Sequence, residues 1–290
     1  MKLPIPSRGL ARLFPFLCAI ALSSADAIDT DKLQADAAQG SAEAQFLLGR
    51  AYFRGEGAPQ DDAQAFAWYQ KAARQGNAKA QNNLAGLYMN GRGVARDEAE
   101  AVKWYRRAAE QGASLAQDAL GQLFARGLGV PKDSKQAAVW YRKAAEQDYV
   151  DAQVHLANLY FFGDEGIPKD QAEAAKWLAK AAAQGNSWAQ NTLGVAYEHG
   201  FGLGQDVKLA AVWYQKAAEQ GDAKGQSNFG KACADGAGVE QSWPKAYQWL
   251  TLSADQGEIT AKKLLAAYQD HFNPEAVAAG KRLIEQYRKK

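Results

Sequence analysis

The chain has 290 residues, with 34 basic and 32 acidic side chains and a formal net charge of +2. This near balance argues against a nucleic-acid-binding protein, which needs a concentrated basic face. Two cysteines, Cys18 and Cys233, are too few for a disulfide framework. Packing must therefore supply the stability of the fold.

The first 27 residues differ in composition from the rest. Three basic residues precede an apolar run at residues 13–22, and Ala25-Asp26-Ala27 follows with small residues at its first and third positions. This order is typical of a secretory signal peptide, and the run is shorter than the ~20 residues that span a bilayer. A buried N-terminal helix, the alternative, fits poorly with Pro15. We expect cleavage near Ala27 and a periplasmic or secreted protein that does not span the membrane.

Cleavage would also change the charge balance. It would remove three of the 34 basic and one of the 32 acidic residues, which leaves 31 of each and no formal net charge. Cys233 would be the one remaining cysteine, so no internal disulfide could form. We expect no nucleic-acid partner.

From residue 28 onward the chain is repetitive. The segment AFAWYQKAARQG (65–76) recurs with variations five more times, and its tryptophans are 36 or 37 residues apart. A fixed period in this range predicts a solenoid, in which each unit packs on its neighbours. The marker tryptophans are Trp68, Trp104, Trp140, Trp177, Trp213 and Trp249.

We predict an all-α chain with two amphipathic helices in each repeat. A capping helix would occupy residues 28–40, six repeats residues 41–256, and a partial seventh repeat with a closing helix residues 258–290. The seventh first helix is expected over 259–270, and Asn273-Pro274 would begin the closing helix. The repeats lie at approximately 41–76, 77–112, 113–148, 149–185, 186–221 and 222–257.

The first helix of each repeat is predicted from small and large residues that share one face, as in Ala44-Leu48-Gly49. An aromatic residue usually follows, and Cys233 takes its place in the sixth repeat, which predicts a buried thiol. The second helix presents the tryptophan, a following Tyr or Leu and alanines at helical spacing, which indicates core.

Glycine pairs separated by one residue mark the turns between the two helices, as in Gly55 and Gly57. No strand precedes these turns, so a phosphate-binding loop is not predicted. Four or five residues later an oxygen-bearing side chain is expected to cap the second helix. These predicted N-caps are Asp61, Asp97, Asp133, Asp170, Asp206 and Ser242.

With these positions in hand, each unit resembles the Sel1-like repeat, a longer relative of the tetratricopeptide repeat. The second unit, AKAQNNLAGLYMNGRGVARDEAEAVKWYRRAAEQG, matches the pattern of that repeat almost throughout, and the resemblance covers residues 39–270. It implies a right-handed superhelix of helix pairs with the first helices on the concave surface. It also implies a role as an adaptor, envelope regulator or host-contact protein. One cysteine-rich branch is associated with penicillin binding and weak β-lactamase activity, but this chain lacks the cysteines of that branch.

Catalytic chemistry is not predicted. The three histidines, His155, His199 and His271, lie in different units without metal-binding spacing. One Ser-x-x-Lys, at 242–245, coincides with a helix start and lacks the other motifs of serine acylating enzymes. We expect no catalytic residue, metal or cofactor.

A binding surface is expected where residues vary between units, on the first helices. Phe161, Phe162 and Trp188 stand out, because neighbouring units have polar residues there and aromatic anchors with a polar rim are typical of hot spots. Alternatively, these rings pack at the irregular fourth junction, and the asparagines are merely solvated. The predicted residues are Phe46, Arg50, Asn82, Met89, Asn90, Gln122, Arg126, Asn158, Phe161, Phe162, Trp188, Asn191, Glu198 and His199.

Three functional hypotheses follow from the sequence and the resemblance. The first is a non-catalytic adaptor of the bacterial envelope that binds a protein or peptide through its first helices. The second is a binder of peptidoglycan fragments or a regulator of a cell-wall enzyme. The third is an enzyme of the type associated with the cysteine-rich branch.

Overall fold

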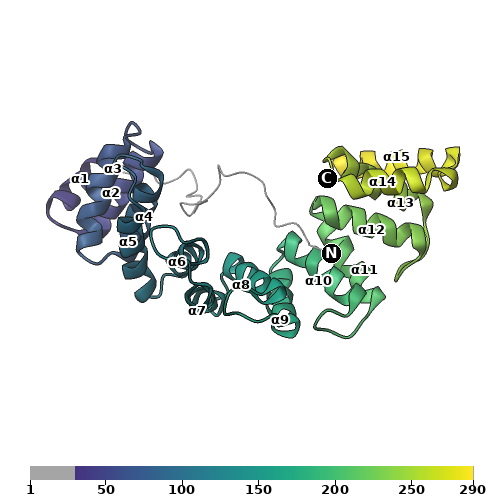
Figure 1. The fold of residues 1–290 in the computed structure, drawn as a ribbon. Helices are drawn as coiled ribbons and strands as arrows, with labels where there is room; N and C mark the ends of the chain where they lie inside the picture. The colour runs from purple at the N-terminus through teal and green to yellow at the C-terminus, as the bar shows by residue number, and fades with distance from the viewer. Residues whose placement is uncertain (1–29, 290) are drawn as a thin grey trace. The chain divides into compact units, whose positions relative to one another are not determined.

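The computed structural model describes residues 30–289, so the predicted signal peptide and its cleavage site lie outside the described part (Figure 1). These residues form helices, with one isolated β-bridge between Asp164 and Ile167. No helix among them has the length and apolar character that crossing a bilayer requires. The helices are α1 (Thr30–Ala38), α2 (Ala42–Arg54), α3 (Asp62–Arg74), α4 (Ala78–Asn90), α5 (Glu98–Glu110), α6 (Ser114–Arg126), α7 (Ser134–Ala145), α8 (Val150–Phe162), α9 (Gln171–Ala183), α10 (Ser187–His199), α11 (Val207–Glu219), α12 (Ala223–Asp235), α13 (Trp243–Asp255), α14 (Ile259–Ala267), a 3-10 turn η1 (Gln269–His271) and α15 (Pro274–Arg288).

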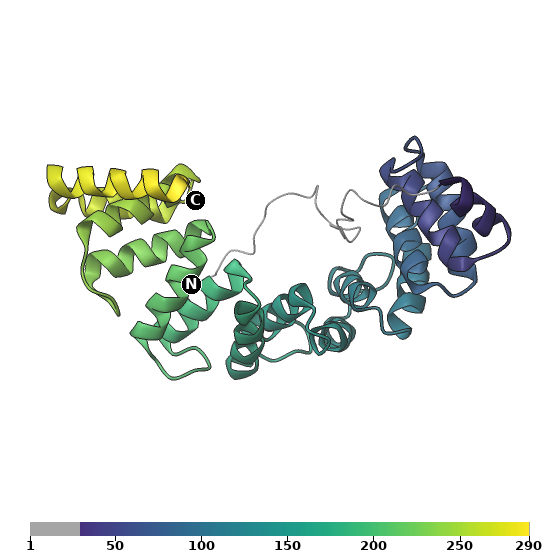
Figure 2. The same cartoon turned by 180° about the vertical axis from the view of Figure 1, so that it is seen from behind.

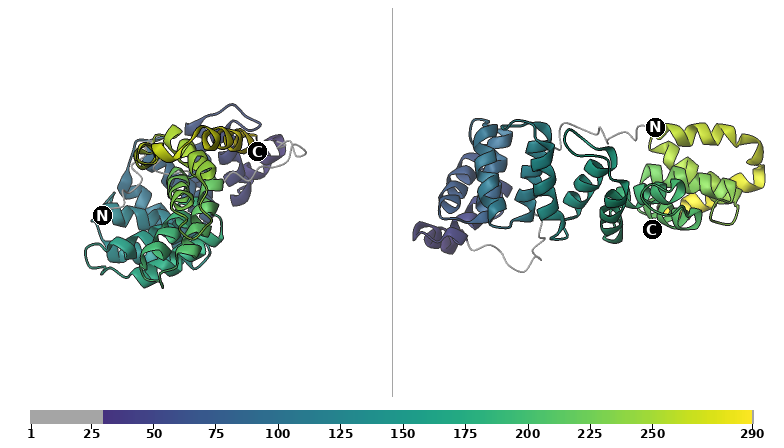
Figure 3. Two further views of the ribbon diagram at one scale, coloured as in Figure 1. Left: turned by 90° about the vertical axis from the view of Figure 1, so that its right-hand side faces the viewer. Right: turned by 60° about the horizontal axis from the view of Figure 1, so that its bottom comes forward.

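The chain divides into two compact units, one up to Gln147 and one from Asp148. We call them the N-terminal and the C-terminal unit. Inside each unit, every first helix packs on the second helix of its own repeat, as α2 does on α3 and α10 on α11. Each second helix also contacts the next first helix in its unit, and Figures 2 and 3 show these helix pairs from other sides. The predicted all-α repeat fold is thus confirmed.

The helix ends follow the predicted local chemistry with one exception. Five aspartates cap the second helices by accepting a hydrogen bond from a backbone N–H two or three residues on. Ser242 occupies the same position before α13, but its side chain makes no such bond. Its backbone instead donates to Cys233 O at 2.8 Å and accepts from Ala246 N at 2.9 Å. The prediction of a side-chain cap at Ser242 is therefore wrong.

Close packing of the two helices in a repeat depends on a missing side chain. A Cβ built on Gly49 would lie 2.7 Å from the Tyr69 ring, and one on Gly194 would lie 2.6 Å from the ring of Tyr214. Such distances are shorter than real carbon contacts, so the tyrosine occupies the space that a larger residue would need. This explains the small residue that the sequence places after the buried leucine.

The second glycine of the turn packs on the preceding repeat. Gly93 has φ +68°, and a Cβ there would meet the Asp62 carbonyl oxygen at 2.0 Å. Gly202 stands in the same relation to Gln171, also at 2.0 Å. Glycine is required at this position both by the left-handed backbone and by the neighbouring helix start.

A buried glutamine on the first helix links two second helices in four repeats, through Gln81, Gln117, Gln190 and Gln226. Gln81 donates from Nε2 to Ala73 O at 3.1 Å, at the end of α3. Its Oε1 accepts from Gln111 Nε2 at 2.7 Å, at the end of α5. The other glutamines whose Oε1 accepts such a bond are Gln45, Gln117, Gln153, Gln190 and Gln226.

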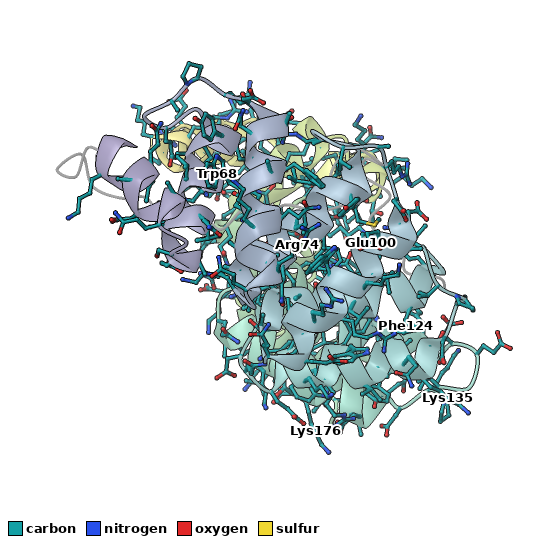
Figure 4. The ribbon with its side chains drawn as sticks, turned by 90° about the vertical axis from the view of Figure 1, so that its left-hand side faces the viewer. Trp68, Arg74, Glu100, Phe124, Lys135 and Lys176 are labelled. Carbon is teal, nitrogen blue, oxygen red and sulfur yellow. The ribbon has the colours of Figure 1, made fainter. Side chains whose placement is uncertain are left out.

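The marker tryptophans are buried or half-buried, as predicted for core positions. A cation three residues later covers the ring in five repeats, and Trp68, labelled in Figure 4, lies 3.8 Å from Lys71 Nζ. This contact combines cation–π attraction with coverage by the aliphatic stem. The remaining pairs are Trp104 with Arg107, Trp140 with Lys143, Trp177 with Lys180 and Trp213 with Lys216, at 4.1 to 4.4 Å.

The C-terminal end departs from the repeat. The seventh first helix ends at Ala267 rather than Asp270, because the chain turns through η1. Asn273 caps α15 as predicted, by accepting from Ala276 N at 2.8 Å. Tyr287 of α15 packs edge-on against Trp249 at 5.3 Å.

We predict that the turn glycine is sensitive to the neighbouring carbonyl as well as to its own φ. Gly112 also has positive φ, but nothing lies within 4 Å of a Cβ built on it. Gly112→Ala should lower the free energy of unfolding by about 1–2 kcal/mol from backbone strain alone. Gly93→Ala should cost about 3 kcal/mol or more, because the clash with Asp62 adds to that strain. Urea unfolding of both variants measures the difference, and equal losses would contradict the role of the carbonyl.

Candidate partner-binding face

The varying residues of the first helices form the candidate face, which we call the first-helix face. It is described for each unit separately. Three of the predicted residues, Phe46, Met89 and Asn191, are buried within the chain. The others are half-buried or exposed, namely Arg50, Asn82, Asn90, Gln122, Arg126, Asn158, Phe161, Phe162, Trp188, Glu198 and His199.

Phe46 is buried because the second helix of its repeat and the next first helix both reach it. Its ring lies 5.9 Å from that of Tyr69, and Lys79 Nζ is 5.8 Å from its centroid. Phe46 therefore lies beneath the first-helix face, and the charged Lys79 lies over its ring.

Beside Phe46 lies a polar cluster in the N-terminal unit with incomplete hydrogen bonding. Arg50 Nε and Asn82 Oδ1 are buried atoms without a hydrogen-bond partner, and the Tyr69 hydroxyl is buried beside the Asn83 amide. Asn82 donates from Nδ2 to Asn83 Oδ1 at 3.3 Å. Burial raises the pKa of Tyr69 far above its usual value, so the hydroxyl keeps its proton at neutral pH.

Other charged side chains of this unit are engaged. Arg92, in the turn between Gly91 and Gly93, stacks on Phe53 at 4.1 Å and donates two bonds to Asp62, at 2.7 and 2.8 Å. This bidentate pair joins the second repeat to the first. Asn90 donates to the carbonyl of Gly86, so its side-chain amide already has a partner within its own helix.

In the third repeat, Gln122 donates from Nε2 to Asp118 Oδ2 at 2.8 Å. Asp118 is buried, so this carboxylate belongs to the packed layer beneath the face. Arg126 remains exposed at the end of α6. Of the predicted residues in this repeat, Arg126 is therefore exposed to solvent, and Gln122 is held by Asp118.

The C-terminal unit carries a cluster of partly exposed rings. Phe161 packs edge-on against Phe162 at 5.1 Å and against Phe201 at 5.9 Å. His199 lies 5.3 Å from Phe201. We call Phe161, Phe162, His199 and Phe201 the aromatic cluster. All three phenylalanines are half-buried, and the histidine is exposed.

Two predicted polar residues of this unit make hydrogen bonds within the chain. Glu198 accepts from the Tyr214 hydroxyl at 2.5 Å, and burial together with this carboxylate raises the pKa of Tyr214. Asn191 accepts from Asn228 Nδ2 at 2.8 Å, which links the fifth and sixth repeats. These bonds fix the side chains of Glu198 and Asn191 on α10.

Trp188 is not part of the aromatic cluster. Its side chain is half-buried near the start of α10, and no ring contact joins it to another aromatic residue in the described chain. Its carbonyl accepts from the Thr192 hydroxyl at 2.8 Å. The structure thus brings together Phe161 and Phe162 but leaves Trp188 as a separate aromatic residue of the same unit.

Comparison with known families decides what the chain is. The Sel1 repeat model matches six segments that together cover more than half of the chain. The chain belongs to the Sel1 repeat family. The matched segments are residues 42–77, 78–112, 114–149, 150–186, 189–222 and 223–258.

A solved structure supports this assignment. A Sel1 repeat protein from Oxalobacter formigenes is similar at 37% identity with a TM-score of 0.71, over 84% of this chain and 70% of that one. A protective antigen of uropathogenic Escherichia coli with an SLR fold is 30% identical, over 90% of this chain and 71% of that one, with a TM-score of 0.40. A comparison with curated proteins finds no match. Sel1 repeats generally form scaffolds for protein–protein interaction.

The side chains that could serve in catalysis or metal binding are part of the packed Sel1 repeats. Cys233 is buried, as predicted, and burial raises its pKa to about 11, which suppresses the thiolate. His271 stacks on Trp243 at 4.4 Å, beside the closing helix. In residues 30–289 no group of three or more His, Cys, Asp or Glu side chains could hold a metal ion.

One member of the aromatic cluster was missed by the sequence analysis. Phe201 lies between the two turn glycines Gly200 and Gly202, outside the first helix. The corresponding residue in other repeats is Glu56, Arg92, Leu128 or Ala237. A phenylalanine in a turn was the available signal, but only the fold places it against Phe161 of the preceding repeat.

We predict that Phe161 contributes more to stability than Phe162, because it has two ring contacts rather than one. Phe161→Ala should lower the free energy of unfolding by about 2–3 kcal/mol, and Phe162→Ala by about half as much. Chemical denaturation of the two variants tests this. A larger loss for Phe162→Ala would show that the ring contacts do not set the packing.

Proposed function

We propose that this Sel1 repeat chain is a non-catalytic adaptor of the bacterial envelope. It binds a protein or peptide partner through the first-helix face of the C-terminal unit. The observation that supports this most is the half-buried aromatic cluster, which combines apolar rings with the exposed His199. The envelope location rests on the predicted signal peptide.

The aromatic cluster has the composition of an interaction hot spot. Phe162 lies at the edge of the cluster and contacts Phe161 alone among the rings, so part of its surface is left for a partner. Burial of such partly exposed rings by a partner removes apolar area from water, which is favourable. Polar groups at the rim, such as Asn158 and His199, would exclude water from the contact.

The packing of this unit also favours rigid presentation of the rings. Tyr214 holds Glu198, the chain neighbour of His199, and Asn228 holds Asn191 on the same helix α10. A preorganised surface loses less side-chain entropy when it binds. The chain therefore needs no conformational change in α10 to present the aromatic cluster to a partner.

We predict that replacement of the edge residues weakens partner capture without unfolding the chain. The double variant Phe162→Ala with Trp188→Ala should reduce binding of the partner from envelope extract by about 2 kcal/mol or more. Capture on immobilised protein, followed by mass spectrometry and titration of the retained partner, measures this. Val139→Ala with Val212→Ala is a matched control, because these valines are 47% and 46% exposed on second helices.

The stability of the variants separates binding from folding. Trp140→Ala removes a buried ring and should cost about 3–5 kcal/mol of stability. A double variant as unstable as Trp140→Ala would show that Phe162 and Trp188 are core. Equal capture by wild type and double variant would move the contact elsewhere, and retention of muropeptides alone would favour a glycan ligand.

A further inference from the structure

One side of α14, the first helix of the partial seventh repeat, is uncovered. Leu265 occupies the position of the buried leucine or phenylalanine of the six earlier first helices, where the exposed fraction is 0 to 5%. Leu265 itself is only half-buried, and Ala266 beside it is exposed although its six equivalents are buried. Ile259, at the start of the helix, is 66% exposed. α14 therefore matches the earlier first helices in sequence but not in burial.

The uncovered side is the one on which a second helix packs in the complete repeats. A Cβ built on Gly230, the equivalent of Ala266 in the sixth repeat, would lie 2.8 Å from Leu250 of α13. No second helix follows α14, because α15 packs on α13 instead. A Cβ on Gly280 of α15 would accordingly lie 2.7 Å from the Tyr247 ring of α13. The chain thus ends its array with a first helix that lacks a second helix of its own.

Two lysines lie on the uncovered side of α14. It is formed by residues at positions i, i+3, i+4 and i+7, which share one face of a helix. These residues are Ile259, Lys262, Lys263 and Ala266, which we call the α14 face. Both lysines are exposed, and neither has an ion-pair partner within residues 30–289. The α14 face therefore combines apolar surface with two uncompensated cations.

Lys262 occupies the position that holds a buried glutamine in the six earlier first helices. In the sixth repeat, Gln226 Oε1 accepts from Gln256 Nε2 at 2.8 Å, at the end of the second helix. Lysine has three donors and no acceptor. The end of a helix that covers α14 must therefore supply an acceptor, and a carboxylate makes a stronger bond to an ammonium group than a neutral amide does.

We propose that the α14 face binds an amphipathic helix of a partner protein, which completes the seventh repeat between two molecules. The bound helix places a large apolar side chain on Ala266, as α13 places Leu250 on Gly230. It carries carboxylates near its C-terminal end, and these pair with Lys262 and Lys263. The contact lies on a different surface from the aromatic cluster and goes beyond the proposed adaptor contact there.

The charge of the α14 face decides which kind of helix fits it. Every second helix of this chain, like α1, is followed by a glutamine at the position that would meet Lys262. A second copy would therefore place a neutral amide against the ammonium group, whereas an acidic helix supplies a charge-assisted bond. A capping role alone would account for the lysines but not for Ile259, since burial of this side chain by a partner is favourable.

The test uses peptides with the sequence of residues 206–221, kept helical by a lactam bridge at positions 215 and 219, which are exposed in the chain. Gln220 is the residue that should meet Lys262, because it donates to Gln190 of its own first helix at 2.7 Å. Three labelled peptides carry Gln, Glu or Lys at this position. Fluorescence polarisation with the full chain should show at least tenfold tighter binding of the Gln220→Glu peptide than of the Gln220→Lys peptide.

Variants of the chain locate the contact. Lys262→Glu should reverse the order of the Glu and Lys peptides. Ala266→Trp should weaken binding of the Gln220→Glu peptide at least tenfold, because the indole occupies the space of the peptide's apolar side chain. Both positions are exposed, so the melting temperature should remain that of the wild type. Lys281→Glu, at an exposed lysine of α15, is the matched control and should leave the order unchanged.

Three results would overturn the proposal. The first is binding that does not depend on the residue at position 220, or an order that also reverses in Lys281→Glu, because either shows a non-specific effect of charge. The second is a molar mass in light scattering that rises with concentration and falls back in Ala266→Trp, which would identify a second copy as the occupant. The third is loss of peptide binding in the double variant Phe162→Ala with Trp188→Ala, which would place the peptide on the first-helix face. Unchanged binding in that variant is expected, so the adaptor function and this contact are tested separately.

Discussion

Within each unit the repeats depend on a buried glutamine that a first helix inserts between the ends of two second helices, as Gln81, Gln117, Gln190 and Gln226 do. A helix C-terminus leaves backbone carbonyls without a partner inside the helix, and burial without a donor is costly. Gln81 satisfies Ala73 O at the end of α3 and accepts from Gln111 at the end of α5. Because one side chain makes both bonds, it fixes the distance between successive second helices. The opening helix takes part in the same way, since Gln45 donates to Ala37 O at 3.1 Å.

In this arrangement, the residues of a first helix that pack within the fold lie on one side of that helix. The glutamine, the small residues and the leucine face the second helices, and the turn glycine rests on the preceding repeat. The opposite side is then free to vary, as the contrast between repeats shows. At equivalent positions of the first helix, Phe53 is covered by Arg92, Met89 is buried, and Glu198 holds Tyr214. The array keeps its geometry while individual repeats acquire different contacts, which is the basis on which a partner can distinguish one repeat from another.

Features that depend on residues close in the sequence were predictable. Helices, aspartate caps and glycine turns follow from local hydrogen bonds and backbone conformation, and they were predicted from spacing alone. The predictions that failed did so for one of two reasons, either a local exception or a contact with another repeat. Ser242 starts a helix without a side-chain cap. The burial of Asn191 depends on Asn228 in the next repeat, and the role of Phe201 depends on Phe161 in the previous one. A pattern within one repeat contains no information on either contact.

The end of the array shows how one position changes the surface that a repeat presents. In five repeats a lysine or arginine covers the marker tryptophan, which leaves a charged, hydrated surface on the second helix. In the sixth repeat Leu252 replaces the cation, and the ring of Trp249 is covered by Tyr287 of α15 instead. The Tyr287 hydroxyl also donates to the Ala218 carbonyl at 3.3 Å, so the closing helix reaches the preceding second helix. An apolar residue at this position thus exchanges a solvent-facing cation for a docked helix. The same substitution in an interior repeat would expose a tryptophan with nothing to cover it, which explains why the change suits the last repeat.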